Sequence, residues 1–151
     1  MIKIICIGKL KENYLKDAVL EYTKRLSKYT KVSIIELNDV NNTDINNIIK
    51  KEEEEVLKNI DVKDYIITLD INGQSISSTE FAKKMSDVFI SYSNITFIIG
   101  GSYGLSDKIK NISHYRMSFS KLTFPHQLFR VMLLEQIYRT FKINNNEEYH
   151  K

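Results

Sequence analysis

The chain contains few of the residues that build disulfides, zinc sites and linkers. It has one cysteine, one proline and three histidines among 151 residues. One cysteine forms no internal disulfide, and a reducing cytoplasm is the simplest compartment for such a chain. Three widely spaced histidines give no zinc-binding spacing, so we expect no metal. Without a proline-rich hinge, we expect residues 1–151 to form a single domain.

Long apolar runs and several catalytic motifs are also missing. The opening MIKIICIGKL is too short to span a membrane, is followed at once by charged residues, and lacks a small-residue cleavage site. We therefore expect neither a membrane segment nor a signal peptide. Cys6, inside this run, is predicted to be a small buried hydrophobic residue rather than a nucleophile. No G-x-S-x-G or Walker motif occurs.

Short apolar runs alternate with segments of helical periodicity. Strands are predicted at residues 2–9, 31–37, 64–71, 94–101 and 115–120, and helices at residues 12–29, 41–60, 79–92, 106–113 and 125–143. Ser78 is expected to cap the third helix, and NGQS at residues 72–75 to form a turn. This alternation predicts an α/β fold, in which helices sandwich a sheet that is mainly parallel.

Positive charge is concentrated in the last third of the chain. From Lys108 onward there are eight lysines and arginines but only three acidic residues, and all three histidines lie there too. A basic end suits an anionic partner such as RNA, although chance clustering is the alternative. The run KKEEEE at residues 50–55 is predicted to be a solvated helix face.

The stretch FIIGGSYGL is the first candidate ligand site. It places Gly100, Gly101 and Gly104 where a strand ends, so that the backbone can approach a ligand closely. A plain tight turn is the alternative. Asp70, at the end of the third predicted strand, is either a general base or a cap for the turn that follows.

The stretch SFSKLTFPHQLFR is the second candidate. A polar loop leads to Pro125, which suits the first turn of a helix, and helix starts attract anions. His126 and Arg130 lie four residues apart on one face near that start, and solvated side chains are the alternative. Further along, Arg139 follows Glu135 by four residues and is expected to form either a structural ion pair or an RNA contact.

The last predicted helix is apolar around nearly its whole circumference, from Leu128 to Phe141. Such a helix must be buried on every side, and one sheet covers only one side. We therefore predict a two-fold homodimer, with a neighbouring helix as the alternative cover.

Several segments resemble one known family. TLDINGQSISSTEFA, FIIGGSYGL, SFSKLTFPHQLFRVMLLEQIYR and the terminal YHK are similar to the ribosomal large-subunit pseudouridine N3-methyltransferases of the SPOUT class. The resemblance covers the whole chain. It implies a C-terminal deep trefoil knot, S-adenosylmethionine as cofactor, a homodimer, and a pseudouridine of 23S rRNA in the assembled ribosome as substrate.

The resemblance also implies roles for individual residues. The matching cofactor-binding positions are Leu69, Gly100, Gly101, Gly104, Ser120, Lys121, Leu122, Thr123, Phe124 and Pro125. The partner's tail would complete the site with positions that match Tyr149, His150 and Lys151. His150 and His126 are the candidates to accept the N3 proton, and Tyr149 is suited to stack on a base. The candidate catalytic residues are His126, Arg130, Tyr149 and His150, with Arg130 expected to contact the imide or an RNA phosphate. Candidate RNA contacts are Arg130, Arg139, Tyr149, His150 and Lys151.

Two tail positions depart from the family pattern. Asn146 and Glu148 stand where many relatives have Gly and Pro. Because Asn tolerates the left-handed conformation, we expect the turn to survive, whereas loss of Pro is expected to loosen the tail. The alternative function is a non-catalytic RNA- or ribosome-binding factor, which would not bind S-adenosylmethionine.

Overall fold

A computed structural model describes all residues 1–151 and contains one five-stranded sheet. Its strands are β1 (Ile2–Ile7), β2 (Val32–Leu37), β3 (Tyr65–Ser75), β4 (Ile95–Ile99) and β5 (Tyr115–Ser118). Their order is β2-β1-β4-β3-β5, and every neighbouring pair is parallel. The predicted α/β alternation and parallel sheet are confirmed.

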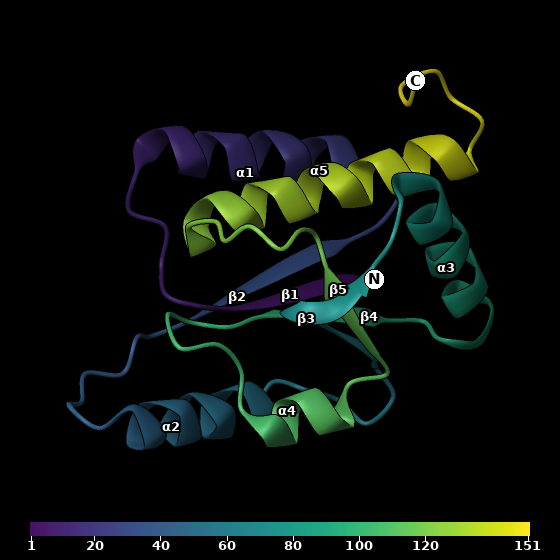
Figure 1. Ribbon diagram of the computed structural model, residues 1–151. Helices are drawn as coiled ribbons and strands as arrows, with labels where there is room; N and C mark the ends of the chain where they lie inside the picture. The colour runs from purple at the N-terminus through teal and green to yellow at the C-terminus, as the bar shows by residue number, and fades with distance from the viewer.

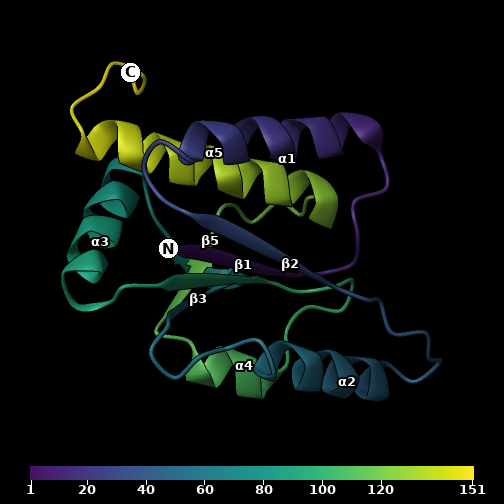
Figure 2. The same cartoon turned by 180° about the vertical axis from the view of Figure 1, so that it is seen from behind.

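Five helices cover the two faces of this sheet. They are α1 (Asn13–Leu26), α2 (Ile45–Leu57), α3 (Ser78–Ser91), α4 (Asp107–Ile112) and α5 (His126–Asn144). Figure 1 shows α1, α3 and α5 on one side of the sheet and α2 and α4 on the other. The view from behind in Figure 2 agrees, and it shows α1 and α5 lying side by side. Sandwiching of the sheet by helices is therefore confirmed.

The alternation of side chains along β1 explains the two layers. Ile4 and Cys6 join the cluster under α1, α3 and α5, whereas Ile5 and Ile7 join the cluster under α2 and α4. Cys6 is only 1% exposed. Burial raises the pKa of its thiol to about 11. The prediction that Cys6 is a buried hydrophobic residue is confirmed.

Two local predictions are wrong, and a third holds only in part. The segment 72–75 is no turn, because β3 bulges after Leu69 and pairs again with β5 at Gln74 and Ser75. The cap of α3 is Ser77, whose side chain accepts from the Glu80 N–H in a capping box. The run at residues 50–55 is exposed at Lys50, Lys51, Glu54 and Glu55, as predicted. Glu52 is the exception: it is 8% exposed and packs beside Gly101.

Neighbouring helices cover much of α5. Both α1 and α3 pack along it, and Leu133, Leu134 and Ile137 are fully buried. The outward row is less covered: Leu128 is 40% exposed, and Met132 is half-buried. Neighbouring helices, the alternative to a homodimer, therefore cover the flanks of α5. They leave this outward row open in the single chain.

Candidate active site

A cavity of about 440 Å³ opens at the carboxyl ends of β3, β4 and β5, next to the start of α5. This edge is where open parallel sheets bind ligands. The predicted cofactor residues that line it are Leu69, Gly100, Gly101, Gly104, Ser120, Leu122, Thr123 and Phe124. Lys121 and Pro125 belong to the same loop but do not line the cavity. The structure thus brings three segments, far apart in sequence, around one space.

The glycine segment forms one wall of the cavity with its backbone. Gly104 has a φ of 78°, and its N–H donates to the Gly101 carbonyl at 3.1 Å. A Cβ on Gly100 would lie 2.9 Å from the carbonyl carbon of Gly104. A Cβ on Gly101 would lie 3.1 Å from Glu52 Oε1. Gly104 therefore permits a left-handed turn, and the missing side chains of Gly100 and Gly101 permit close packing.

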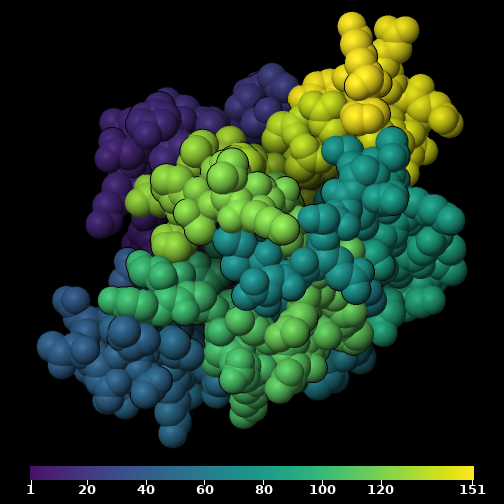
Figure 3. Space-filling model, viewed as in Figure 1, coloured from purple at the N-terminus to yellow at the C-terminus, as the bar shows by residue number.

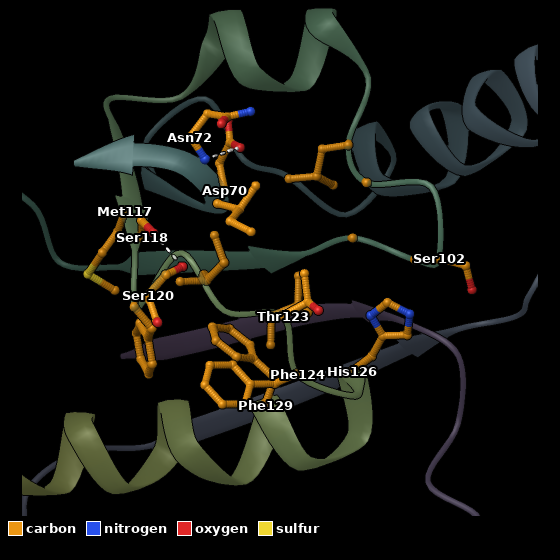
Figure 4. Close-up of a pocket in the computed structure, with 18 of the residues that line it drawn as sticks. Asp70, Asn72, Ser102, Met117, Ser118, Ser120, Thr123, Phe124, His126 and Phe129 are labelled. Atoms are coloured by element: carbon orange, nitrogen blue, oxygen red, sulfur yellow. Dashed lines mark hydrogen bonds between the residues drawn. The ribbon is translucent and has the colours of Figure 1, made fainter. Parts of the chain in front are cut away.

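The loop between β5 and α5 forms the opposite wall (Figure 4). The Ser118 hydroxyl donates to the Ser120 carbonyl at 3.1 Å, and the Leu122 N–H donates to the Ser120 hydroxyl at 3.0 Å. The Phe124 ring stacks with Phe129 of α5 at a centroid distance of 6.4 Å. These contacts fix the loop against α5 and give the cavity an aromatic side.

The bulge of β3 contributes a third wall. The Asn72 N–H donates to Asp70 Oδ1 at 3.0 Å, so Asp70 caps the bulge (Figure 4). Its other oxygen lies 3.7 Å from Lys110 Nζ and 3.9 Å from Arg116 Nε. The capping alternative for Asp70 is the one that the structure supports.

Arg130 occupies a different place from the one predicted. Its side chain is 1% exposed, and it donates to Glu36 Oε2 at 2.7 Å and to the Gly8 carbonyl at 3.1 Å. A guanidinium in this position cannot meet an RNA phosphate. We therefore correct its assignment: Arg130 ties the first turn of α5 to the ends of β1 and β2.

His126 is the one predicted catalytic residue that lines the cavity of its own subunit. It is the first residue of α5 and is half-buried. In Figure 4 its ring lies at the end of the cavity toward Ser102 of the glycine segment.

The tail residues lie at the other end of α5, where Figure 3 shows the terminus projecting from the molecule. The Tyr149 hydroxyl donates to Glu135 Oε1 at 3.0 Å; burial and this bond raise its pKa to about 12. Arg139 forms the predicted ion pair with Glu135 at 2.8 Å, and its guanidinium lies 3.1 Å from His150 Nδ1. Lys151 is exposed.

Within the single chain, the tail residues do not reach the cavity. Tyr149 and His150 contact Glu135 and Arg139. These two residues follow His126, the first residue of α5, by about 14 and 20 Å along the helix axis at about 1.5 Å per residue. Neither Tyr149 nor His150 lines the cavity that contains His126. The predicted tail residues and the predicted cofactor residues therefore do not come together within one chain.

Comparison with known proteins gives the family. Residues 1–150 match the family model described as "Predicted SPOUT methyltransferase". The chain belongs to the SPOUT methyltransferase family. It is 52% identical to the ribosomal RNA large subunit methyltransferase H of Clostridium tetani over 99% of both chains. It is 53% identical to that of Clostridium botulinum, again over 99% of both chains.

A solved structure supports the fold alone. A methylase family protein from Haemophilus influenzae Rd KW20 has a TM-score of 0.59 and is 16% identical. The match covers 99% of this chain and 70% of that protein. The predicted membership of a methyltransferase family is confirmed by the sequence relatives, and the α/β arrangement by this neighbour.

Some residues of this SPOUT methyltransferase site were not predicted. Asn72 was assigned to a turn, and Phe129 was counted only among the apolar residues of the last helix, yet both line the cavity. The i, i+4 spacing of Phe129 from Pro125 was the available signal for its place beside the loop. No three histidine, cysteine or acidic side chains come together as metal ligands. No helix has the length and hydropathy that a membrane span requires.

Proposed function

We propose that this protein transfers a methyl group from S-adenosylmethionine to N3 of a pseudouridine in 23S rRNA, within the assembled ribosome. The name of the relatives, ribosomal RNA large subunit methyltransferase H, supports the reaction class and the RNA. The resemblance of the YHK tail and the LTFPHQLFRV block supports the nucleoside. The concentration of positive charge after Lys108 suits an RNA partner.

The cavity has the size and lining that the cofactor requires. Its volume of about 440 Å³ falls within the usual range for small-molecule sites. Leu69, Leu122 and Phe124 offer apolar surface for a purine and a thioether chain, and the glycine segment brings bare backbone to the edge. When bound, S-adenosylmethionine supplies a methyl group on a positively charged sulfur. The residues around it bind, orient and exclude water.

The separation between tail and cavity is the observation that carries the arrangement we propose. Tyr149 and His150 rest on Glu135 and Arg139, about 14 to 20 Å along α5 from His126, and line no part of their own cavity. We propose a two-fold homodimer in which each tail closes the partner's site. The open outward row of α5, which includes Leu128 and Met132, offers apolar surface for such contact.

The chemical roles follow from the side chains. N3 of pseudouridine carries a proton at neutral pH and must lose it before it attacks, and His126 or the partner's His150 is placed to accept it. Tyr149 of the partner supplies a ring for stacking on a base, and Lys151 a cation for a phosphate. Arg139 holds the tail through His150 and Tyr149. Arg130 acts indirectly, because it fixes the first turn of α5, from which His126 projects.

We propose, in addition, that the C-terminal third is threaded as a deep trefoil knot. The sheet order supports this, because the chain leaves β4, passes β3 and reaches β5 at the sheet edge before it returns to α5. The bulge of β3 also pairs with Met117 and Ser118 at the point where the chain turns back. A crystal structure in which the chain is traced from Gly100 to His126 tests the threading.

Removal of residues 149–151 tests the proposed function. We expect the truncated protein to bind S-adenosylmethionine with nearly intact affinity by calorimetry, because every residue that lines the cavity is kept. We expect it to lose methylation of ribosomes, measured by transfer of a labelled methyl group and located by mass spectrometry. Full activity after truncation would refute the role of the tail. If the intact protein does not bind S-adenosylmethionine at millimolar concentration, a non-catalytic RNA-binding factor becomes the better explanation.

A further inference from the structure

We infer that Glu147 is a positioning residue for the shared site: it fixes the direction in which the last residues leave α5. This inference rests on the proposed role of the tail in the partner's cavity. Glu147 is separated from Tyr149 by a single residue and lies among side chains of two helices. No prediction from the sequence assigned it a role.

The backbone first sets the geometry of the exit. The Glu147 N–H donates to the Lys142 carbonyl at 3.0 Å, and the Asn146 N–H donates to the Ile143 carbonyl at 3.1 Å. Asn146 has a φ of 54°. Together these features form a Schellman motif with asparagine in the left-handed position that glycine usually takes. The turn expected from Asn146 is thus present.

The side chain of Glu147 then clamps this turn. Its Oε2 accepts from Lys142 Nζ at 2.7 Å, and its Oε1 accepts from the Tyr29 hydroxyl at 2.7 Å. Lys28 Nζ lies 3.4 Å from Oε2. In most Schellman motifs an apolar contact joins these two positions, whereas here an ion pair joins Glu147 to Lys142. The bonds from Lys142 and Tyr29 lower the pKa of Glu147 to about 2, so the clamp is charged at neutral pH.

The partners of Glu147 are themselves held in place. The Tyr29 ring stacks on Phe141 of α5 at a centroid distance of 5.5 Å. Lys142 has a side chain that is 17% exposed, and its Nζ lies 5.5 Å from the Tyr138 ring centroid. Glu147 therefore joins the end of α1 to the end of α5. This clamp offsets the flexibility that we expected from the missing proline at position 148.

A clamped exit raises the fraction of subunits whose tail points correctly before RNA binds. When only a fraction of a protein is competent to bind, the apparent affinity falls by that fraction. Loss of the clamp is therefore expected to raise the KM for ribosomes while kcat at saturation is largely kept. A general structural defect would instead weaken cofactor binding and lower kcat.

Three variants test this inference. Glu147→Ala removes both acceptors and is expected to raise the KM for ribosomes about ten-fold, the effect of losing a charged hydrogen bond. Glu147→Gln keeps an acceptor for Tyr29 and should show a smaller rise. Glu148→Ala is the matched control, because Glu148 is exposed and makes no hydrogen bond or ion pair. S-adenosylmethionine affinity, the melting temperature and release of Lys151 by a carboxypeptidase are measured alongside.

Support requires a raised KM and faster release of Lys151 in Glu147→Ala, with unchanged cofactor affinity and a melting temperature lowered by no more than about 4 °C. An unchanged KM, an equal rise in Glu148→Ala, or a fall in kcat alone would overturn the inference. The protein without residues 149–151 distinguishes a failure of the clamp from a failure of the proposed role of the tail. If it is inactive while Glu147→Ala has the normal KM, only the clamp is refuted; if it is fully active, the proposed role of the tail is refuted.

Discussion

Replacement of Arg130 by methionine separates a structural role from a role in RNA binding. The guanidinium is 1% exposed and makes two hydrogen bonds, to Glu36 at 2.7 Å and to the Gly8 carbonyl at 3.1 Å. Breaking a buried ion pair costs about 3–5 kcal/mol. Because the Glu36 side chain is 35% exposed, water compensates part of the loss. We therefore expect a destabilisation at the lower limit, about 3 kcal/mol.

Urea and thermal unfolding measure this cost. For a chain of this length, about 3 kcal/mol corresponds to a fall in melting temperature of about 9 °C. The control is Arg25→Met, whose pair with Glu21 has side chains 43% and 53% exposed; because water screens this pair, the fall in melting temperature should be much smaller. A double variant with Glu36→Gln should cost less than the sum of the two single changes.

The pH dependence gives a second check on Arg130. Burial raises the pKa of Glu36, but hydrogen bonds from the Leu10 N–H and from Arg130 outweigh it, so the pKa is lowered overall. A lowered pKa contributes stability above its unfolded value, and this contribution is lost as the pH falls. The effect of Arg130→Met should therefore be larger at pH 7 than at pH 3. Normal stability together with weakened ribosome binding would refute this account and restore an RNA contact for Arg130.

Further expected outcomes concern the cavity, the thiol and the tail. Gly101→Ala places a Cβ 3.1 Å from Glu52 Oε1, and calorimetry should show about ten-fold weaker S-adenosylmethionine binding, partly recovered in a double variant with Glu52→Ala. Cys6, buried and with a pKa of about 11, should react with a disulfide reagent at pH 8 only after urea unfolds the protein. Because the pKa of Glu147 is lowered to about 2, its clamp should hold throughout the neutral range. Release of Lys151 by a carboxypeptidase should therefore be constant from about pH 5 to 8 and increase only below the unfolded pKa of about 4.3; an increase between pH 5 and 8 would contradict the assignment.

The periodic elements were predictable because each depends on neighbouring residues. The apolar run at β1 and the helical spacing of α1 and α5 led to correct elements with small shifts at their ends. The prediction for residues 72–75 failed because local turn preference was outweighed by pairing of Gln74 with Met117, far along the chain. The Ser77 cap was missed by one residue, because Ser77 and Ser78 are adjacent where the helix begins and only geometry distinguishes the cap from the first helical residue.

The candidate site, like the fold, was predictable only in part. The glycine segment and the loop after β5 were identified from local chemistry and from the family resemblance, and the structure brings them together at one cavity. Burial of Arg130 was not predictable, because its partner Glu36 lies 94 residues earlier. The clamp at Glu147 was missed for the same reason, since Tyr29 is 118 residues away. Ion pairs between distant elements leave no periodic signal in the sequence.

A mixed dimer tests the central claim most directly. One subunit lacks residues 149–151, and the other carries Gly100→Val, which places side-chain atoms against the Gly104 backbone, 2.9 Å from the Cβ position. The two chains are co-expressed with different tags and the mixed species is purified. Each variant alone should be inactive, whereas the mixed dimer has one intact site and should methylate ribosomes at about half the normal rate. A mixed dimer as inactive as its parents would contradict a site shared between subunits.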